Sequence, residues 1–520
     1  MDSPLQVDSN LPVNIGTLAC VLVLISAFVM LGFSTKSASK NASSSLYLPS
    51  RIPIFGNTLS FAMNVGRYHE WVTGHSLERD GQPFALNLVG KSDVVYVSRP
   101  EHFEEILKTQ NKNFIKSDSV RDTFDDFLGE NIVLLNGEQW KFHRKVMVNL
   151  LTPRALREYI TPVVQEKVLV LRNVLNEASR AKQTFDMNKL IRQFTLDTFV
   201  EIGLGCKLNL LTSGEEHPFE IAFDEANHLT SKRFSTPTWI WKPMRWLNIG
   251  SERRLRDAIG EMNEFIVNLI MDAMEQVSSL KESATENHRT CKNIITILLN
   301  NDQGIAPTLV RDIVLTGLEA GRNTTADTLV WLFHALSLNP RVEKKLRDEI
   351  LTKMPKFKES DTYVPTYEEI QDLPYMEATI QETFRLFPSV PVIPYHCACD
   401  TVLKDGTFIP AGVDVFLYLY GAGRLASVWG LHVLSFMPER FLDEETGKLL
   451  QDPPAKNWAF GTGPRLCVGR NLAMVELKMV IATVVSQFTL AEEPGQDVQP
   501  IVDLTLTMKN PLMMRVEAAN

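Results

Sequence analysis

Cys467 lies in a stretch whose residue types could bind a metal ion. The stretch reads FGTGPRLCVG from Phe460 to Gly469, and a helical pattern from Arg470 to Val485 follows it directly. Its glycines and proline indicate a tight loop, so Cys467 is expected at the start of a helix. Unpaired N–H groups and the helix dipole stabilise an anion there. That favours a thiolate, the form of cysteine that ligates metals.

The side chains around Cys467 could also hold a flat macrocycle with acidic arms. Gly463 and Gly469 let the backbone approach such a ring closely. Arg465 can pair with a carboxylate, and Phe460 can shield the sulfur from water. A free cysteine is most often buried and structural. The full spacing Phe-x-x-Gly-x-Arg-x-Cys-x-Gly is much more specific, and it resembles the cysteine-ligand loop of the cytochrome P-450 superfamily, the haem-thiolate monooxygenases.

This resemblance implies that haem b is the cofactor and that Cys467 ligates its iron. A thiolate ligand pushes electron density toward the iron and favours cleavage of the O–O bond. The implied fold is mainly α-helical with small β-sheets, and a long central helix crosses over the haem.

A run of small and polar residues, AGRNTT beginning at Ala320, lies midway along a long apolar helical pattern from Pro307 to Leu338. By itself such a run indicates a close crossing of two helices. It also resembles the segment of the family that faces the oxygen site. Ala320 and Gly321 would leave room for O₂, and Thr324 would supply a hydroxyl that bonds back to a helical carbonyl. Asn323 stands where the family usually has Asp or Glu; an amide cannot relay a proton by itself, although it can hold a water.

Two further places resemble contacts to the haem propionates. The segment WKFHR, from Trp140 to Arg144, resembles the Trp-x-x-x-Arg helix of the family, in which both residues reach the propionates. Taken alone it would be an amphipathic surface helix. His396 occupies a place where the family often has a basic propionate contact.

A pair of charges lies on a predicted helix that starts near Pro374 and ends before Pro388. Glu382 and Arg385 share one face of this helix because they are three residues apart. Such pairs are common on protein surfaces. The pair resembles the Glu-x-x-Arg helix of the family, and FMPERF resembles the segment that adds Arg440. The three residues would form a buried network that holds the cysteine loop in shape.

Composition excludes several other classes of protein. The 520 residues are 44% hydrophobic and carry a formal net charge of −9. No basic block or basic-aromatic stripe occurs, which argues against binding of nucleic acid. The six cysteines are scattered, so neither a disulfide framework nor a zinc finger is predicted. No flavin or nicotinamide fingerprint is found, and the resemblance implies that electrons come from NADPH-cytochrome P-450 reductase.

The N-terminal region predicts a membrane anchor. Residues 15–33 form an uncharged run of 19 residues, long enough to span a bilayer. Basic residues follow this run rather than precede it, which places the downstream chain in the cytoplasm and disfavours a cleaved signal peptide. We therefore predict a single-pass protein of the endoplasmic reticulum membrane. Its parts are a lumenal N-terminus over 1–14, a transmembrane anchor over 15–34, a proline-containing linker over 35–57 and a haem-thiolate monooxygenase domain over 58–520.

Strands are predicted only in patches. Residues 85–88 and 94–97 are short β-type runs on either side of a turn, GKSD, and predict a hairpin. Residues 402–415 predict a second hairpin that turns at Asp405 and Gly406. Residues 488–491 and 501–516 predict a final small sheet.

Three longer segments, 241–252, 385–391 and 504–510, resemble the fatty-acid omega-hydroxylases of plants and fungi. The resemblance implies a lipid or other hydrophobic substrate, hydroxylated with O₂ near its omega end. In a related animal branch a Glu stands at the place of Ala320 and forms an ester to the haem, which Ala320 excludes. The alternatives are a monooxygenase of sterols or specialised metabolites, a haem-thiolate isomerase or dehydratase that needs no O₂, and a non-catalytic haem sensor. Thr324 argues against the isomerase or dehydratase.

Overall fold

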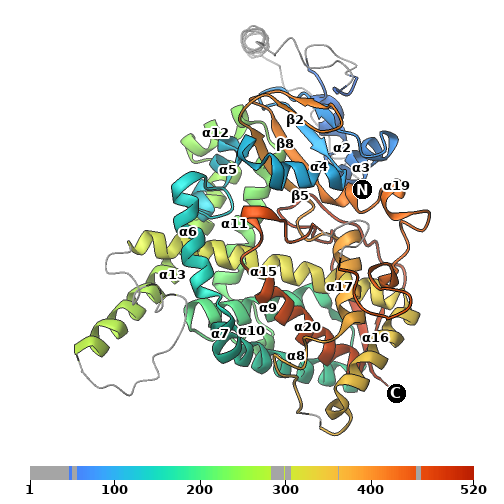
Figure 1. Ribbon diagram of the computed structural model, residues 1–520. Coiled ribbons are helices and arrows are strands. Elements are labelled where there is room, and N and C mark those ends of the chain that lie inside the picture. Colours follow the sequence, from blue (N-terminus) through green and yellow to red (C-terminus); the bar gives the residue numbers. More distant parts are fainter. Residues whose placement is uncertain are drawn as a thin grey trace, which may run out of the picture.

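The computed structural model describes residues 46–49, 55–282, 295, 298, 306–360, 362–451 and 458–519. This part of the chain forms a sheet region and a larger helical region, seen at the top and the bottom of Figure 1. Its α-helices are α2 (Thr58–Asn64), α3 (Tyr68–Glu78), α4 (Pro100–Glu104), α5 (Asp118–Leu128), α6 (Gly137–Leu150), α7 (Pro153–Ala155), α8 (Thr161–Ala181), α9 (Met187–Leu204), α10 (Leu210–Ser213), α11 (Pro218–Ser235), α12 (Thr238–Leu247), α13 (Gly250–Glu282), α15 (Pro307–Ser337), α16 (Pro340–Lys353), α17 (Pro374–Leu386), α18 (Leu419–Ala422), α19 (Ala426–Trp429) and α20 (Arg470–Gln487). The prediction of a mainly α-helical fold with small sheets is confirmed.

The strands form one sheet of five strands and two smaller sheets. The large sheet has the order β1-β2-β8-β5-β3, and its pairs are antiparallel except for β2 and β8. A second sheet has the order β4-β10-β9, and β6 pairs with β7. The strands are β1 (Phe84–Leu86), β2 (Val94–Val97), β3 (Phe114–Ile115), β4 (Phe185–Asp186), β5 (Val392–Cys397), β6 (Thr401–Val402), β7 (Phe408–Ile409), β8 (Asp414–Tyr418), β9 (Phe488–Glu492) and β10 (Met513–Ala518).

The predicted strands are confirmed to different degrees. The first hairpin is formed by β1 and β2, with Phe84 opposite Tyr96. The second is shorter than predicted, because β8 leaves it and pairs with β2 in the large sheet. In the last sheet β10 covers only the end of 501–516. The earlier residues of that segment turn back, and the N–H of Leu506 donates to the carbonyl of Ser389.

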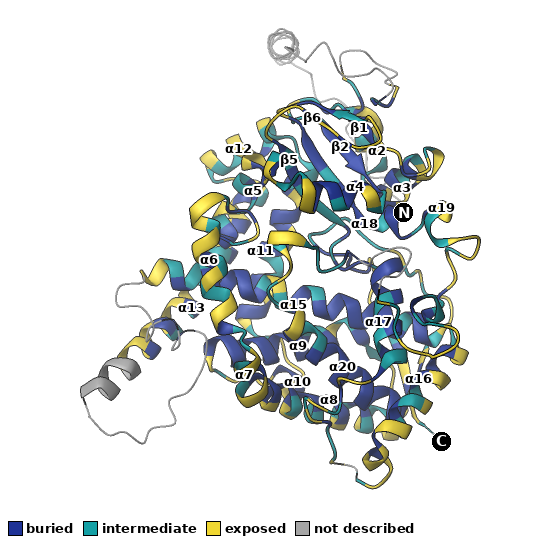
Figure 2. Ribbon diagram, in the orientation of Figure 1, coloured by how far each residue is buried: buried dark blue, intermediate teal, exposed yellow. Residues whose placement is uncertain are grey.

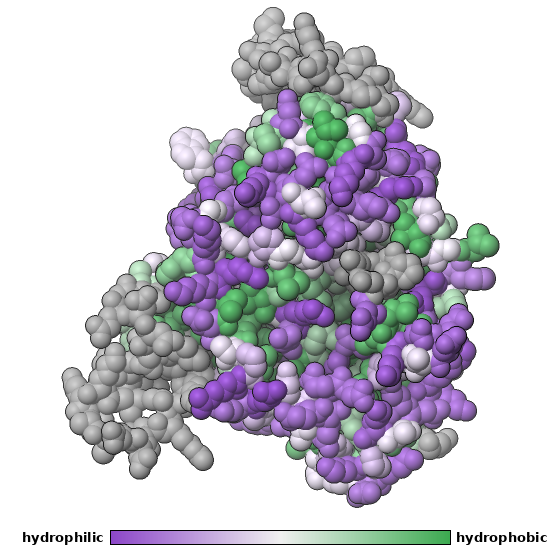
Figure 3. Space-filling model, in the orientation of Figure 1, coloured by the Kyte–Doolittle hydropathy of each residue, from purple (hydrophilic) through white to green (hydrophobic). Residues whose placement is uncertain are grey.

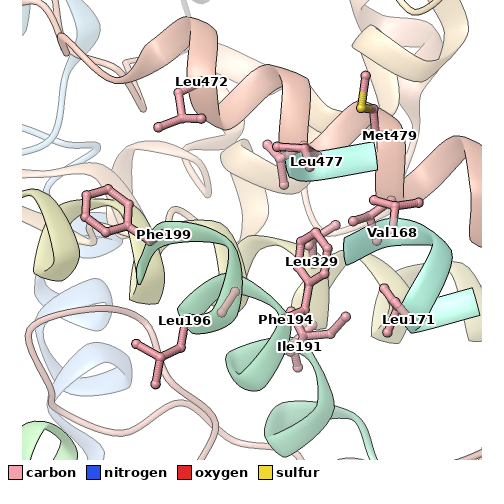
Figure 4. Packing of buried hydrophobic residues seen from close by; sticks show 14 of the residues in the cluster. Val168, Leu171, Ile191, Phe194, Leu196, Phe199, Leu329, Leu472, Leu477 and Met479 are labelled. Atoms are coloured by element: carbon pink, nitrogen blue, oxygen red, sulfur yellow. The ribbon is translucent and has the colours of Figure 1, made fainter. Parts of the chain in front are cut away.

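The long helix α15 forms the centre of the helical region. Pro307 occupies its first turn, where a missing N–H costs nothing, and the helix stops just before the Pro340 that begins α16. Most of its side chains are buried, as its nearly all-round apolar pattern predicts (Figure 2). α9 packs along it, and α8 and α20 complete the same core. Figure 4 shows this packing through Val168, Leu171, Ile191, Phe194, Leu196, Phe199, Leu329, Leu472, Leu477 and Met479.

The predicted anchor over 15–34 lies outside the described residues. Among the helices that are described, none combines the length and apolar character needed to cross a bilayer. The described part of the predicted linker contacts β1. The N–H of Leu48 donates to the carbonyl of Ala85, and the N–H of Ala85 donates to the carbonyl of Leu46. Both leucines are buried, so this end of the linker is part of the packed fold.

Candidate active site

The cysteine loop has the predicted form. Cys467 directly precedes α20, whose N-cap is Gly469, and its side chain is exposed on the wall of a large cavity. Its N–H donates to the carbonyl of Phe460 at 2.9 Å, which closes the loop. Burial of the site raises the pKa of the thiol. Hydrogen bonds from the N–H groups of Gly469 and Arg470, with the charge of Arg144, act in the opposite direction because they stabilise a thiolate.

The two glycines of the cysteine loop differ in how much room the structure leaves for a side chain. Gly463 has a φ of +67°, and a Cβ atom there would lie 2.4 Å from the carbonyl oxygen of Leu107. Only glycine fits this position, because the loop passes directly against the backbone of a neighbouring segment. A Cβ atom at Gly469 would meet only the sulfur of Cys467, at an ordinary 3.9 Å. Its part in approach to a macrocycle therefore stays a prediction.

Basic side chains line the cavity wall beside the loop. Arg465 donates to the carbonyl of Leu135 at 2.7 Å, and its guanidinium lies 4.8 Å from the centre of the Trp140 ring. Arg144 lies over the same ring at 5.7 Å and donates to the carbonyl of Leu466 at 2.9 Å. Within the described part of the chain neither arginine pairs with a carboxylate. This wall is therefore prepared for anionic groups supplied by a ligand.

Lys116 is a third cation of this wall, and sequence reasoning missed it. It is 5% exposed and lies 3.8 Å over the ring of Tyr395, with Nζ donating to the carbonyl of Pro394. Burial and the charge of Arg465 hold its pKa well below the usual range. An anion placed here would raise the pKa of Lys116 again, because it would neutralise the neighbouring positive charges of Lys116 and Arg465.

His396 lies apart from the other candidates. Its Nδ1 is 2.9 Å from a carboxylate oxygen of Asp414, the residue opposite it in the pairing of β5 with β8. It is not among the residues that line the cavity, whereas its neighbour Tyr395 is. The predicted propionate contact at His396 therefore stays untested, whereas Lys116, which directly follows β3 of the same sheet, lines the cavity.

On the opposite wall α15 presents the predicted small and polar residues. Ala320, Gly321 and Thr324 all line the cavity. The hydroxyl of Thr324 donates to the carbonyl of Ala320 at 2.7 Å, the back-bond predicted from the sequence. A Cβ atom at Gly321 would lie 2.8 Å from the ring of Phe199 on α9. The glycine therefore allows α9 and α15 to cross closely, which was the structural alternative for this run.

Asn323 is buried behind the cavity wall rather than on it. Its amide nitrogen lies 3.3 and 3.4 Å from the two carboxylate oxygens of Glu319, one helical turn earlier. Glu319 lines the cavity and also accepts a hydrogen bond from Asn227 at 3.4 Å. Burial raises the pKa of Glu319 to about 8. A carboxyl that stays protonated at neutral pH thus stands next to the amide.

The predicted ion-pair network is present in full. Two nitrogens of Arg385 donate to the two carboxylate oxygens of Glu382, both at 2.7 Å. Arg440 donates to the same carboxylate at 3.1 Å. Both arginines also donate to backbone carbonyls of the loop between α18 and Met437, so the network ties α17 to that loop. The ring of Phe384 contacts Phe460 edge-on, which links this helix to the cysteine loop.

The cavity between α15 and the cysteine loop has a volume of about 2170 Å³. A typical pocket for one small molecule has about 300–1,000 Å³. The cavity is therefore large enough for a macrocycle and a second molecule side by side. A family model described as "Cytochrome P450" matches residues 47–516 of this chain. The chain belongs to the cytochrome P450 family. This P450 is a monooxygenase, as predicted from the cysteine loop.

Individual relatives agree with this assignment. The chain is 30% identical to cytochrome P450 94A1 of Vicia sativa, over 86% of this chain and 87% of the relative. It is 31% identical to cytochrome P450 94B1 of Arabidopsis thaliana, over 91% and 92%. It is also 29% identical to cytochrome P450 704B1 of the same plant, over 90% and 94%. All three matches cover most of both chains.

A haem fits the residues of the cavity. Cys467 offers one sulfur that two N–H groups stabilise as thiolate. Arg144, Arg465 and Lys116 could offer charge to propionates, and both arginines lie near the ring of Trp140. When bound, haem supplies the activation of dioxygen and the oxidation of the C–H bond. The chain itself would supply the sulfur ligand, orient the substrate and deliver protons.

Thr324→Ala should uncouple this P450. The variant loses the hydroxyl that α15 presents to the cavity, so protons arrive more slowly where oxygen is reduced. We expect the ratio of released hydrogen peroxide to hydroxylated product to rise about tenfold or more at similar NADPH consumption. Thr328→Ala is a matched control, because Thr328 bonds back to the carbonyl of Thr324 in the same way but does not line the cavity. Equal peroxide release by both variants would contradict a role for the Thr324 hydroxyl.

Proposed function

We propose that this P450 hydroxylates fatty acids near their omega end, with O₂ and with electrons that a reductase passes from NADPH. The single observation that carries the proposal is a buried lysine without a carboxylate partner in the described chain, Lys91, on the cavity wall among the residues of the β1–β2 turn and α12. The likeness of three segments to fatty-acid omega-hydroxylases supports the same substrate class. A substrate held by its carboxylate far from the sulfur of Cys467 would present its other end to the reaction.

The mouth of the cavity lies beneath apolar surface. Phe55, just before α2, and Trp239 on α12 both line the cavity, yet they are 46% and 48% exposed. Beyond them Leu59 and Met63 of α2 and Trp246 of α12 are also exposed. Figure 3 shows a mostly hydrophilic face whose hydrophobic side chains gather near the middle, below the level of α2 and α12 in the same orientation. An apolar rim around the opening suits entry of a lipid from a membrane.

Lys91 lies in the turn between β1 and β2, next to this mouth. Its ammonium donates to the carbonyl of Phe234, and the neighbouring Gly90 packs against Trp239. No carboxylate of the described chain pairs with Lys91. Burial lowers its pKa to about 8, so the side chain is cationic at neutral pH and lacks a counter-ion. A fatty-acid carboxylate would supply one.

Lys91→Gln should weaken the binding of fatty acids selectively. A hydrogen bond to a charged group is worth about 1.5–3 kcal/mol, so we expect the dissociation constant to rise about tenfold or more. The measurement is the substrate-binding difference spectrum with a saturated fatty acid and with its methyl ester, which should bind the variant and the parent equally. Binding of the acid to the parent should also weaken as the pH rises through about 8, because Lys91 loses its charge.

The same titration distinguishes the alternatives. A binding spectrum with sterols and none with fatty acids would contradict the proposed substrate class. Product analysis then gives the hydroxylated carbon. An enzyme that rearranges or dehydrates a peroxide would turn over without NADPH.

We infer further that residues 15–34 anchor the protein in the endoplasmic reticulum membrane, with the catalytic domain in the cytoplasm, and that the cofactor is haem b. The apolar residues exposed on α2 and α12 support contact with a membrane. Lys141, Lys145 and Arg470 are exposed near the cysteine side of the site and would meet an acidic surface of NADPH-cytochrome P-450 reductase.

A further inference from the structure

Because Asn323 stands where the family usually has an acid, the delivery of protons to the oxygen site is left without an acidic residue. The reaction reduces one molecule of O₂ with two electrons and two protons; one oxygen atom leaves as water and the other enters the C–H bond. An acidic group on the central helix would ordinarily help to pass these protons, and an amide cannot do so. Asn323 is in addition buried behind the cavity wall, whereas the carboxyl of Glu319 lines it.

We propose that Glu319 is the proton-relay acid of this P450 and that Asn323 is the residue that positions it. The two side chains are four residues apart on α15 and therefore lie on one face of the helix. The amide of Asn323 donates to the carboxyl at 3.3 and 3.4 Å, while its own oxygen lies 3.5 Å from a nitrogen of Arg322. This fixes the amide with its nitrogen toward Glu319.

The surroundings of Glu319 suit a group that passes protons through water. Glu319 and Thr316 both lie on the cavity wall, and Asn227 of α11 donates to the carboxyl. The buried atoms Asn227 Oδ1 and Thr316 Oγ1 have no hydrogen-bond partner in the part of the chain that the structure describes. Buried polar atoms of this kind are where ordered waters bind. Waters here would connect Glu319 with the Thr324 hydroxyl farther along the wall.

Charges around Glu319 keep its proton available. Burial contributes most to raising its pKa to about 8, and the like charge of Asp503 adds to it, while Arg322 acts in the opposite direction. Arg322 is itself fully buried and is balanced by ion pairs to Asp224 and Glu220 on α11. The charge of Arg192 on α9 acts on Asp327 and Asp503. The carboxyl thus holds a proton at neutral pH, gives it up as oxygen is reduced, and regains one from solvent past Asp503, which also lines the cavity.

The central test compares Glu319→Gln with the parent enzyme and its reductase. The substitution keeps the shape and removes the transferable proton. We expect the fraction of NADPH that ends as hydrogen peroxide to rise several-fold. In the parent this fraction should also increase as the pH rises through about 8, because the resting carboxyl then loses its proton. In the variant that dependence should disappear.

Glu476→Gln is the matched control. Glu476 on α20 also lines the cavity and is another buried carboxyl whose pKa burial raises to about 8, but it interacts with Thr325 of α15 rather than with Asn323. We expect no change in the peroxide fraction for this variant. An equal increase in both variants would overturn the proposal, because loss of any buried acid would then be sufficient.

A readout that does not depend on turnover uses the stability of the haem-containing protein. A carboxyl with a raised folded pKa is protonated in the folded state and ionised in the unfolded state between about pH 4.5 and 8. Stability therefore falls across this range in the parent. The difference in melting temperature, that of Glu319→Gln minus that of the parent, should therefore become larger from pH 5 to pH 8. A constant difference would show that Glu319 is ionised at neutral pH and would contradict its role as proton store.

Discussion

Cys467→Ser should remove the sulfur ligand of the haem completely. The reduced carbon monoxide complex of this P450 is expected to lose its red-shifted Soret band, and monooxygenase activity should fall to background. The reason is that the loop presents one sulfur to the cavity, at the N-terminus of α20, where the N–H groups of Gly469 and Arg470 stabilise a thiolate. A serine hydroxyl in this place is not ionised and donates far less electron density.

The control is Cys399→Ser. Cys399 is free and exposed but lies outside the cysteine loop. This variant should keep the full band and normal activity. Survival of the red-shifted band in Cys467→Ser would show that another residue ligates the iron.

Glu382→Ala should prevent stable haem incorporation rather than slow turnover. Its carboxylate is fully buried and accepts hydrogen bonds from Arg385, Arg440 and the N–H of Met437. Removing it strands the buried guanidinium of Arg385, at a cost of about 3–5 kcal/mol. That is a large part of the about 5–15 kcal/mol that stabilises a typical domain. The measurement is the haem content of soluble protein together with its denaturant midpoint.

A neighbouring ion pair provides the comparison. Arg341 pairs with Glu439 at the surface, and its side chain is 53% exposed. Arg341→Ala should cost no more than about 1 kcal/mol, because exposed pairs are screened by water. Full haem occupancy and an unchanged midpoint in Glu382→Ala would contradict the structural role of the network.

The features of the fold and site that could be predicted from the sequence are those that depend on local patterns of residues. The cysteine loop, α15 and the pair of Glu382 with Arg385 each depend on residues a few positions apart, so spacing alone indicates their geometry. The back-bond of Thr324 to Ala320 is of the same kind.

The parts that were missed depend on long-range packing. Lys116 reaches the cavity because the short β3 pairs with β5, which is nearly three hundred residues away in the chain. His396 meets Asp414 because the register of β5 against β8 places them opposite each other. Glu319 looks in the sequence like an ordinary polar residue of a helix. Its perturbed pKa arises only when α11 and the segment around Asp503 pack over it.

The pairing of β2 with β8 has a consequence for biosynthesis. Val94 lies opposite Asp414, so the large sheet joins the beginning and the end of the domain. Contacts this distant along the chain form late, because a long loop must close first. Cys467 follows β8 in the chain, so it is synthesised after both strands of this pair. We therefore expect haem to be loaded only once the strands of the large sheet have been made, and a prematurely terminated product that ends before Cys467 would remain without cofactor and open to degradation.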